Sequence, residues 1–452
     1  MRVGVSSAVA RSVRAASRLT GKGGTTAPGR VLLRLEPDAI ALLSRRLARG
    51  SVLVSATNGK TTTSAMLAAI LDVAGIPVVG NRAGSNMHWG VATALLDAGH
   101  EDGELGLFEV DEAWLPAVAD AVEPRLVVLS NLFRDQLDRY GELELLAERW
   151  AGTVAAHAAH TRFALNADDP LVADLGREIE NKVYFGLDDD SQALPELQHA
   201  ADSKHCRNCG HAYVYDAVYL GHMGHYHCPN CGRRRPEPQL VARRVELHGM
   251  TGAHVHIDTP AGSTDIELKL PGLYNVYNAL AAATAALELG ATLDDVRTGL
   301  EGFGGAFGRV ERIPVAGREV LLLLVKNPAG ANEVLRTLTL EDGALDLWLA
   351  LNDRIADGRD VSWIWDADFE LLAGRVAHVT CSGTRAEEMA LRLKYAGIDA
   401  RAEIDRDLGE SLDLAVANGD PSRPLYALPT YTALLELRDV LSHRGAAARW
   451  SA

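Results

Sequence analysis

A loop of small and hydroxyl-bearing residues, 55–63, has the composition of a phosphate-binding loop. It reads Ser-Ala-Thr-Asn-Gly-Lys-Thr-Thr-Thr, follows the apolar run 52–54 and precedes the apolar helical stretch 65–71. Backbone amides at a helix start bind phosphate oxygens, a lysine there reaches the β and γ phosphates, and the next hydroxyl binds Mg²⁺. We therefore expect an ATP site that is formed by Thr57, Asn58, Gly59, Lys60, Thr61 and Thr62.

Two residues of this loop would carry its chemistry. Lys60 is the expected catalytic cation, because a positive charge stabilises a phosphoryl group in transfer, and Thr61 is an expected Mg²⁺ ligand. The loop departs from the general pattern at Val54, where that pattern has its first glycine. The alternative interpretation is a turn that only caps a helix, since threonine and asparagine are common capping residues.

Glu109 stands at the end of a second apolar run, 105–110, and is followed by Asp111 and Glu112. An acidic residue that ends a strand beside a phosphate loop commonly holds Mg²⁺. We expect Glu109 to be the second Mg²⁺ ligand and assign the two following acids less firmly. The alternative is a solvated acidic loop, although burial of an unpaired carboxylate on the strand would be costly.

Four of the five cysteines form two pairs, each with two residues between its members, and a glycine follows each pair. This spacing is typical of a zinc ribbon, in which four thiolates surround the metal and leave no open position for catalysis. Two disulfides are the alternative, which a reducing cytosol disfavours. The expected Zn²⁺ ligands are Cys206, Cys209, Cys228 and Cys231.

Length and charge bound the class of protein. A chain of 452 residues predicts two or three domains. The net charge of −15 argues against a nucleic-acid partner. No apolar run reaches the roughly 18 residues that span a bilayer, and the arginine-containing N-terminus lacks the apolar core of a secretory signal. We expect a cytoplasmic protein with no transmembrane segment.

Apolar strand-like runs alternate with helical patterns, which predicts an α/β fold with a parallel sheet covered on both faces. Ligands of such sheets bind at the carboxyl ends of the strands. We expect an N-terminal helical segment at 1–48, a central ATP-binding domain at 49–315 with a cysteine-rich insertion at about 196–240, and a smaller C-terminal doubly wound domain at 316–452.

The loop at 57–63 resembles the ATP loop of the Mur ligase superfamily, the ATP-dependent amide-bond ligases of peptidoglycan synthesis. Three further segments, 131–141, 271–280 and 303–311, are similar to landmarks of that superfamily. The resemblance implies a Mur ligase-like central ATPase domain that carries the zinc-ribbon insertion, and a Rossmann-like C-terminal domain.

The same resemblance implies roles for individual residues. Glu109 would bind Mg²⁺, Asn275 and Asn278 would border adenine, and Arg309 would reach ATP from the domain junction as a catalytic cation. For the asparagines, the alternative is a capped helix start. For Arg309, the alternative is an exposed turn with an Arg–Glu pair.

Departures from the superfamily pattern indicate one branch. Gln136 and Tyr140 replace two histidines, and the segments 326–332 and 352–366 differ from the usual landmarks. Together with the four-cysteine insertion, these features resemble the MurT family, the Mur-like subunits of lipid II isoglutaminyl synthase. The resemblance runs from about residue 30 to the end.

In that family the Mur-like subunit uses ATP to phosphorylate the α-carboxylate of D-glutamate in lipid II, and ammonia then gives D-isoglutamine. Cys381 lacks the nucleophile-elbow pattern, so no glutaminase is expected in this chain. The resemblance implies a heterodimer with a GatD-like glutamine amidotransferase at the cytoplasmic face of the plasma membrane. An aspartate of this chain would complete the partner's Cys–His machinery, with Asp357 the first choice and Asp353 and Asp360 behind it.

Two alternative functions remain at this point. One is a stand-alone Mur or folylpolyglutamate-type ligase, against which the missing histidines count. The other is a zinc-ribbon ATPase that binds nucleic acid, for which the run Arg233-Arg234-Arg235 offers a basic patch. The acidic net charge counts against the second alternative.

Overall fold

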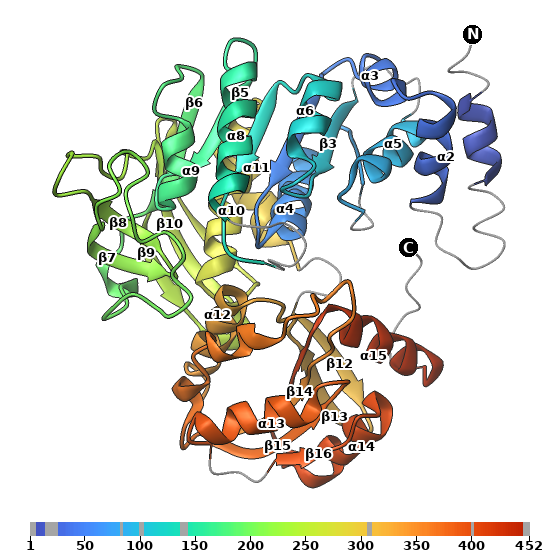
Figure 1. Ribbon diagram of the computed structural model, residues 1–452, viewed down its shortest axis with the longest axis vertical. Coiled ribbons are helices and arrows are strands. Elements are labelled where there is room, and N and C mark those ends of the chain that lie inside the picture. The colour runs from blue at the N-terminus through green and yellow to red at the C-terminus, as the bar shows by residue number, and fades with distance from the viewer. Residues whose placement is uncertain are drawn as a thin grey trace.

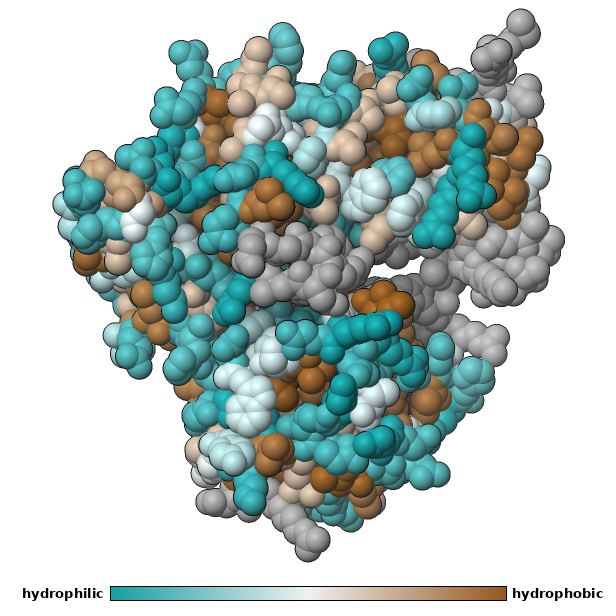
Figure 2. Space-filling model, in the orientation of Figure 1, coloured by the Kyte–Doolittle hydropathy of each residue, from teal (hydrophilic) through white to brown (hydrophobic). Residues whose placement is uncertain are grey.

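The computed structural model describes residues 6–13, 26–81, 85–98, 104–135, 143–304, 310–398 and 402–445. Two α/β bodies follow one another along the chain, and the helix α12 lies at their junction (Figure 1). Figure 2 shows that the visible face is largely hydrophilic, with hydrophobic residues in separated patches.

The first body is built on a nine-stranded sheet with the order β11-β10-β9-β6-β5-β4-β1-β3-β2. The strands from β2 to β9 pair in parallel, whereas β9, β10 and β11 form an antiparallel edge. Their bounds are β1 Ser51–Ser55, β2 Val78–Gly80, β3 Leu105–Glu109, β4 Leu126–Leu129, β5 Arg162–Asn166, β6 Lys182–Leu187, β9 Leu240–Leu247, β10 Ala253–Thr259 and β11 Gly262–Leu268.

Helices cover both faces of this sheet, as the alternating pattern predicts. Val52 and Val54 of β1 belong to one apolar core with α4, α10 and α11, while Leu53 belongs to a second core on the other face. Alternation along a strand sends neighbouring side chains to opposite faces. The helices are α2 Ala27–Leu35, α3 Ala39–Ser44, α4 Lys60–Val73, α5 His88–Asp97, α6 Leu115–Val122, α8 Leu143–His157, α9 Pro170–Leu175, α10 Leu273–Glu288 and α11 Leu293–Gly302.

The expected segment 1–48 implied that the N-terminal helices form a separate unit, but they do not. Leu32 of α2 and Leu43 of α3 are buried in the same core as α5 and α6. The first body therefore includes these N-terminal helices, which bury their apolar faces against it.

The cysteine-rich insertion lies between β6 and β9. It contains the short helix η1 (Asp190–Gln192) and the antiparallel hairpin of β7 (Val214–Leu220) and β8 (Met223–His227). Gly210 and Gly232, which follow the cysteine pairs, have φ angles of 73° and 74°. These left-handed conformations favour glycine.

The second body has a six-stranded sheet in the order β12-β13-β17-β14-β15-β16. All neighbours are parallel except β12 and β13. Two cores flank this sheet, one under α12 and α13 and one under α14 and α15. The elements are β12 Glu311–Val315, β13 Arg318–Leu322, α12 Pro328–Leu338, β14 Leu345–Ala350, η3 Ser362–Trp365, η4 Phe369–Leu372, β15 Val376–Ser382, α13 Ala386–Tyr395, β16 Ala402–Ile404, α14 Leu408–Asn418, β17 Leu425–Pro429 and α15 Tyr431–His443.

The second sheet begins earlier than the expected boundary at residue 315. β12 ends at that residue, yet it pairs with β13 over its whole length, from Glu311↔Leu322 to Val315↔Arg318. The boundary therefore moves to the N-terminal side of Glu311. The reason is that Ala316 and Gly317 have positive φ angles and form a tight hairpin turn, not a linker.

Candidate active site

The phosphate loop connects β1 to α4 at the carboxyl edge of the first sheet. Gly59 precedes the helix with a φ angle of 89°, a conformation that L side chains rarely adopt. A Cβ atom at this position would lie 2.0 Å from Oδ1 of Asn278. Both conditions require glycine and leave the first amides of α4 at the place where phosphate oxygens bind a helix.

Lys60 begins α4 and is 8% exposed. Its Nζ lies 2.7 Å from Oε2 of Glu112. Burial lowers the pKa of Lys60, but the carboxylates of Glu112, Asp111 and Glu109 together raise it above its usual value. Lys60 is therefore a fixed, permanently charged cation, as phosphoryl transfer requires.

Glu112 forms the buried ion pair with Lys60. Burial raises the pKa of Glu112, but the nearby charges of Lys60 and Lys326 outweigh burial and lower it. The carboxylate stays ionised beside the lysine. Sequence reasoning placed Glu112 among the weaker Mg²⁺ candidates, and the structure gives it a contact with Lys60 instead.

The two predicted Mg²⁺ ligands meet at the end of β3. The Thr61 hydroxyl donates to Oε1 of Glu109 over 3.0 Å. Neighbouring ligands of an octahedral Mg²⁺ at about 2.1 Å lie roughly 3 Å apart, so this pair of oxygens suits such an ion. Asn81 holds the strand end in place: its Oδ1 accepts the Glu109 amide over 2.9 Å and its Nδ2 donates to the Glu109 carbonyl over 2.7 Å.

A segment after β4, residues 131–134, lies against one side of the phosphate loop and is called the bracketing segment below. Asn131 accepts the amide of Asn58 and donates to its carbonyl, each over 2.9 Å. Phe133 donates its amide to the Thr57 hydroxyl over 3.0 Å. Sequence reasoning noted this segment only as a family landmark and missed its contacts with the loop. Its position after a buried strand was the available signal.

Asn275 and Asn278 lie behind the loop, with exposed fractions of 2% and 3%. Asn278 accepts from the Thr63 hydroxyl over 3.2 Å and donates to Asn275 over 3.0 Å. Asn275 donates to the Pro271 carbonyl over 2.8 Å. The structure therefore shows both side chains supporting the loop, and their expected contact with adenine stays a prediction. Arg309 lies outside the described residues.

The second body supplies two residues to the same site. Lys326 pairs with Asp135 and donates to the Thr57 carbonyl over 3.3 Å. Asn327, which caps α12, exchanges side-chain hydrogen bonds of 3.0 and 3.3 Å with Asn58. The altered landmark at 326–332 therefore joins the two bodies at the phosphate loop.

The four cysteines of the insertion gather as their spacing predicted. Their sulfur atoms all lie within 4.8 Å of one another, and none is in a disulfide. Zinc–sulfur bonds of about 2.3 Å in a tetrahedron place sulfur atoms roughly 3.8 Å apart. Cys206 and Cys231 are 3.6 Å apart, and Cys209 and Cys228 are 3.4 Å apart, which suits zinc.

The basic run beside the cysteines is largely neutralised by aspartates. Arg233 pairs with Asp174 at 2.9 Å and Arg235 with Asp168 at 2.6 Å. Each pair ties the insertion to the first body. Two of the three arginines of this run are therefore engaged in ion pairs within the chain.

The acidic loop after β14 presents its three predicted aspartates differently. Asp357 is 5% exposed and accepts the amide and hydroxyl of Thr432 at the start of α15, over 2.7 and 2.5 Å. Burial, which outweighs these bonds, raises the pKa of Asp357. Asp353 accepts from Thr384 and Arg385, each over 2.8 Å, and these bonds lower its pKa.

Asp360 is the exposed member of the three. Its Oδ1 accepts the amide of Ser362 over 2.9 Å, and hydrogen bonds from Ser362 lower its pKa. Ile355 and Trp365 of the same loop are 70% and 48% exposed. The loop therefore offers an accessible carboxylate between exposed apolar side chains.

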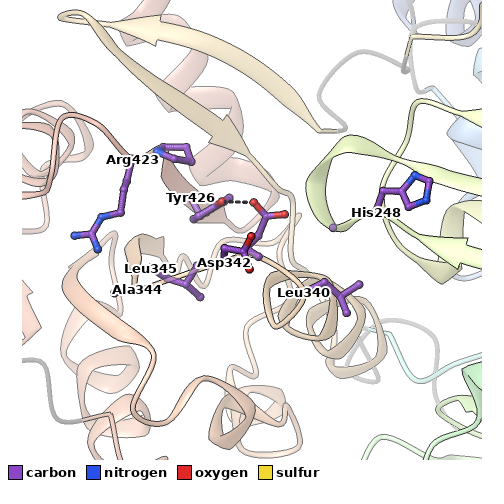
Figure 3. Close-up of a pocket in the computed structure, with 10 residues that line it drawn as sticks. His248, Leu340, Asp342, Ala344, Leu345, Arg423 and Tyr426 are labelled. Carbon is purple, nitrogen blue, oxygen red and sulfur yellow. Dashed lines mark hydrogen bonds between the residues drawn. The ribbon is translucent and has the colours of Figure 1, made fainter.

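A cavity of about 320 Å³ lies far from the phosphate loop, at the amino ends of β14 and β17 (Figure 3). Tyr426 donates to Glu341 over 2.8 Å at its wall, and His248 and Arg423 lie on opposite sides of the view in Figure 3. The cavity does not include any predicted site residue. We therefore place the candidate site at the loop and not at this cavity.

Comparison with known proteins identifies the family. Residues 54–231 match the family model of the Mur ligase middle domain, and residues 324–434 match that of the MurT ligase C-terminal domain. Lipid II isoglutaminyl synthase (glutamine-hydrolyzing) subunit MurT of Staphylococcus aureus strain N315 is 32% identical over 96% of each chain. This chain belongs to the MurT family. The MurT subunit of Streptococcus pneumoniae is 33% identical over 93% of each chain.

Solved structures of similar shape confirm the fold. A pseudomurein peptide ligase type C from Methanothermus fervidus superposes with a TM-score of 0.68 at 22% identity, over 89% of this chain and 80% of that one. MurF of Thermotoga maritima, solved with ADP, has a TM-score of 0.63 at 13% identity, over 92% and 85%. The predicted Mur ligase-like α/β fold is confirmed.

The relatives also separate MurT from the stand-alone ligases. UDP-N-acetylmuramate–L-alanine ligase of Phenylobacterium zucineum is 27% identical over 59% of this chain and 46% of that enzyme. The match to MurT proteins spans nearly the whole chain, including the second body.

Proposed function

We propose that this chain is the ATP-using subunit that activates the D-glutamate α-carboxylate of lipid II for amidation to D-isoglutamine in peptidoglycan synthesis. The observation that carries the proposal is the near-complete match to proteins named as MurT subunits of lipid II isoglutaminyl synthase. The ATP loop with Lys60, Glu112 and the Thr61–Glu109 pair supports it, because this is the machinery that phosphoryl transfer requires.

In this proposal the chain's residues act on the phosphates and on the carboxylate that is phosphorylated. The amides at the start of α4 and Lys60 bind the β and γ phosphates of ATP. Thr61 and Glu109 would hold Mg²⁺, which neutralises charge on the phosphate oxygens. The substrate carboxylate becomes an acyl phosphate, so that ammonia displaces phosphate and not hydroxide.

Ammonia would come from a GatD-like glutamine amidotransferase that forms a heterodimer with this chain. The names of the relatives include glutamine hydrolysis, whereas Cys381 here is fully buried and burial raises its pKa to about 12. A buried neutral thiol is not a nucleophile. The exposed acidic loop around Asp360 is our proposed contact with the partner.

The three aspartates of that loop are distinguishable by experiment. We propose single Asp→Asn variants of Asp353, Asp357 and Asp360, each assayed in the complex for glutamine hydrolysis, ATP turnover and complex formation. The variant that loses glutamine hydrolysis but keeps complex formation and thermal stability identifies the residue that completes the partner's site. Loss of stability instead indicates a capping role, which the Thr432 contacts favour for Asp357.

We also propose that the four cysteines hold a structural Zn²⁺, and that the chain acts on lipid II at the cytoplasmic face of the plasma membrane. No helix in the described part of the chain is long and apolar enough to cross a membrane. In this proposal the lipid of the substrate holds the reaction at the membrane.

The test is amidation by the purified complex. The chain and a GatD-like glutaminase are incubated with ATP, Mg²⁺, glutamine and lipid II, and the muropeptide is analysed by mass spectrometry. We expect replacement of one hydroxyl by an amine, which the Lys60→Met variant abolishes and the exposed-surface control Lys204→Met does not. A gain of a whole amino acid without the partner would show a stand-alone ligase and contradict the proposal.

A further inference from the structure

The turn that joins β7 to β8 of the cysteine-rich insertion packs directly on the segment that brackets the phosphate loop. The rings of His222 and Phe133 are 4.5 Å apart between centroids, and His222 has no exposed surface. Gly221 has a φ angle of 57°, and a Cβ atom there would lie 2.6 Å from the Phe133 ring. The turn is therefore fitted closely to Phe133.

Polar contacts join the insertion to the same segment. Asp202 accepts the Arg134 amide over 2.8 Å and pairs with its guanidinium, and the side chain of Asp202 is 4% exposed. The amide of Asp202 donates to Nδ1 of His222 over 3.3 Å. One carboxylate and one imidazole thus connect the turn to the segment after β4.

The other ring nitrogen of His222 faces the first body. Its Nε2 lies 3.4 Å from Oδ2 of Asp169, and the same oxygen accepts the amide of Leu132 over 2.8 Å. Because Nδ1 acts as an acceptor, the proton of a neutral His222 is on Nε2 and faces a carboxylate. The ring is therefore oriented by the hydrogen bond at Nδ1 and by the contact with Phe133, whereas Nε2 makes no hydrogen bond among the described residues.

The bracketing segment transmits this contact to the phosphate loop. The Asn131 side chain holds both backbone groups of Asn58, its carbonyl accepts the amide of Thr57 over 3.0 Å, and Phe133 binds the Thr57 hydroxyl. The insertion also contacts the second body, since Arg336 of α12 donates to the Tyr219 carbonyl over 2.8 Å. The hairpin therefore contacts both the segment after β4 and the helix α12.

We propose that this turn, residues 219–224, is a positioning element of the phosphate loop, and that Asp202 and His222 are positioning residues that act through residues 131–134. The cysteine cluster holds the far end of the hairpin, and the turn holds the loop in the geometry that binds nucleotide. The proposal gives the insertion a role in nucleotide binding in addition to its structural zinc site. It rests on the proposed function in one respect, that the ligand of the loop is ATP.

The first test compares Asp202→Asn with Asp216→Asn in the full chain. The Asp202→Asn side chain keeps an oxygen for the Arg134 amide but loses the negative charge, so the fold is preserved. Asp216 is on β7, pairs with His227 and is 67% exposed, away from the bracketing segment. We expect the Kd for ATP to rise by roughly 2- to 30-fold in Asp202→Asn, as typical coupling energies allow, and to stay unchanged in Asp216→Asn.

Three further measurements separate positioning from general damage. Zinc content and thermal stability are expected to stay at the wild-type level in Asp202→Asn, while hydrogen exchange at Thr57 and Asn58 becomes faster. In the assembled complex the KM for ATP rises with little change in kcat. Asn131→Ala removes the side-chain bonds to Asn58 but keeps the backbone contacts with Thr57, so in the double variant Asp202→Asn is expected to add less than its full effect.

The outcomes also separate this proposal from the proposed function. Wild-type protein that does not bind ATP contradicts the proposed function. Wild-type protein that binds ATP, together with an unchanged Kd in Asp202→Asn, overturns the positioning role alone. An equal loss in Asp216→Asn, or full additivity with Asn131→Ala, overturns it as well.

Discussion

Glu333 in the middle of α12 is a buried carboxyl group whose replacement gives a pH-dependent change in stability. Val334 and Leu335 of the same helix pack into the core of the second body, whereas Ala329 packs into the core of the first. Helical spacing puts Glu333 on the side of Ala329, at the junction of the two bodies. It is 2% exposed, and neither oxygen has a hydrogen-bond partner among the described residues.

Burial raises the pKa of Glu333 from near 4.5 to about 7, and the charge of Arg336 offsets only part of this. Between these two pH values the native protein keeps a proton that the unfolded chain releases, so stability falls as pH rises through this window. Each pKa unit corresponds to about 1.4 kcal/mol, which gives a destabilisation of about 3 kcal/mol above pH 7. Below the ordinary pKa both states are protonated and the penalty disappears.

Glu333→Gln keeps the shape of the protonated side chain and removes the titration. We expect the variant to gain thermal stability relative to wild type between pH 5 and pH 8, by roughly 5 to 10 °C in Tm for a unit of this size. The measurement is calorimetric Tm of both proteins at several pH values. Glu148→Gln on the exposed face of α8 is the control and should show no such trend. A wild-type-minus-variant difference that stays constant with pH would refute a neutral buried Glu333.

Two further predictions concern the loop and the cysteine cluster. Gly59→Ala should weaken ATP binding by about tenfold or more, which is about 1.4 kcal/mol, because the added Cβ would collide with Asn278. The control is Gly75→Ala, which also has a positive φ angle but has open space around its Cβ, and it should bind ATP normally. Nucleotide titrations of both variants would check this. Cys231→Ser should lower the zinc content measured by elemental analysis from about one ion per chain towards none. The control Cys381→Ala should keep the wild-type zinc content. Equal zinc contents in the two variants would contradict the proposed zinc site.

Local sequence signals predicted much of the fold. The runs at 52–54 and 105–110 became β1 and β3, because buried parallel strands are continuous apolar segments. The pairing of β12 with β13 was missed, because the charged residues of β12 hide its period. Such an edge strand is defined by its neighbour more than by its own composition.

The sequence likewise predicted some residues of the candidate site and missed others. Lys60, Thr61 and Glu109 were predicted, because each stands next to a strand end or helix start that the sequence reveals. Asn131 and Glu112 were missed as contacts of the loop, because they act through residues distant in sequence.

The sequence by itself determined the chemistry of this protein: the phosphate loop, the acid at the end of β3, the cysteine spacing and the branch of the Mur superfamily. These depend on residue type and on short spacing, which local geometry converts directly into a strand, a loop or a metal knuckle. Only the tertiary structure decided that Glu112 pairs with Lys60, that the asparagines of α10 support the loop, and that the insertion packs on the segment beside the phosphate loop. Those contacts join segments that pack together only after both sheets have formed, and burial then sets their charges.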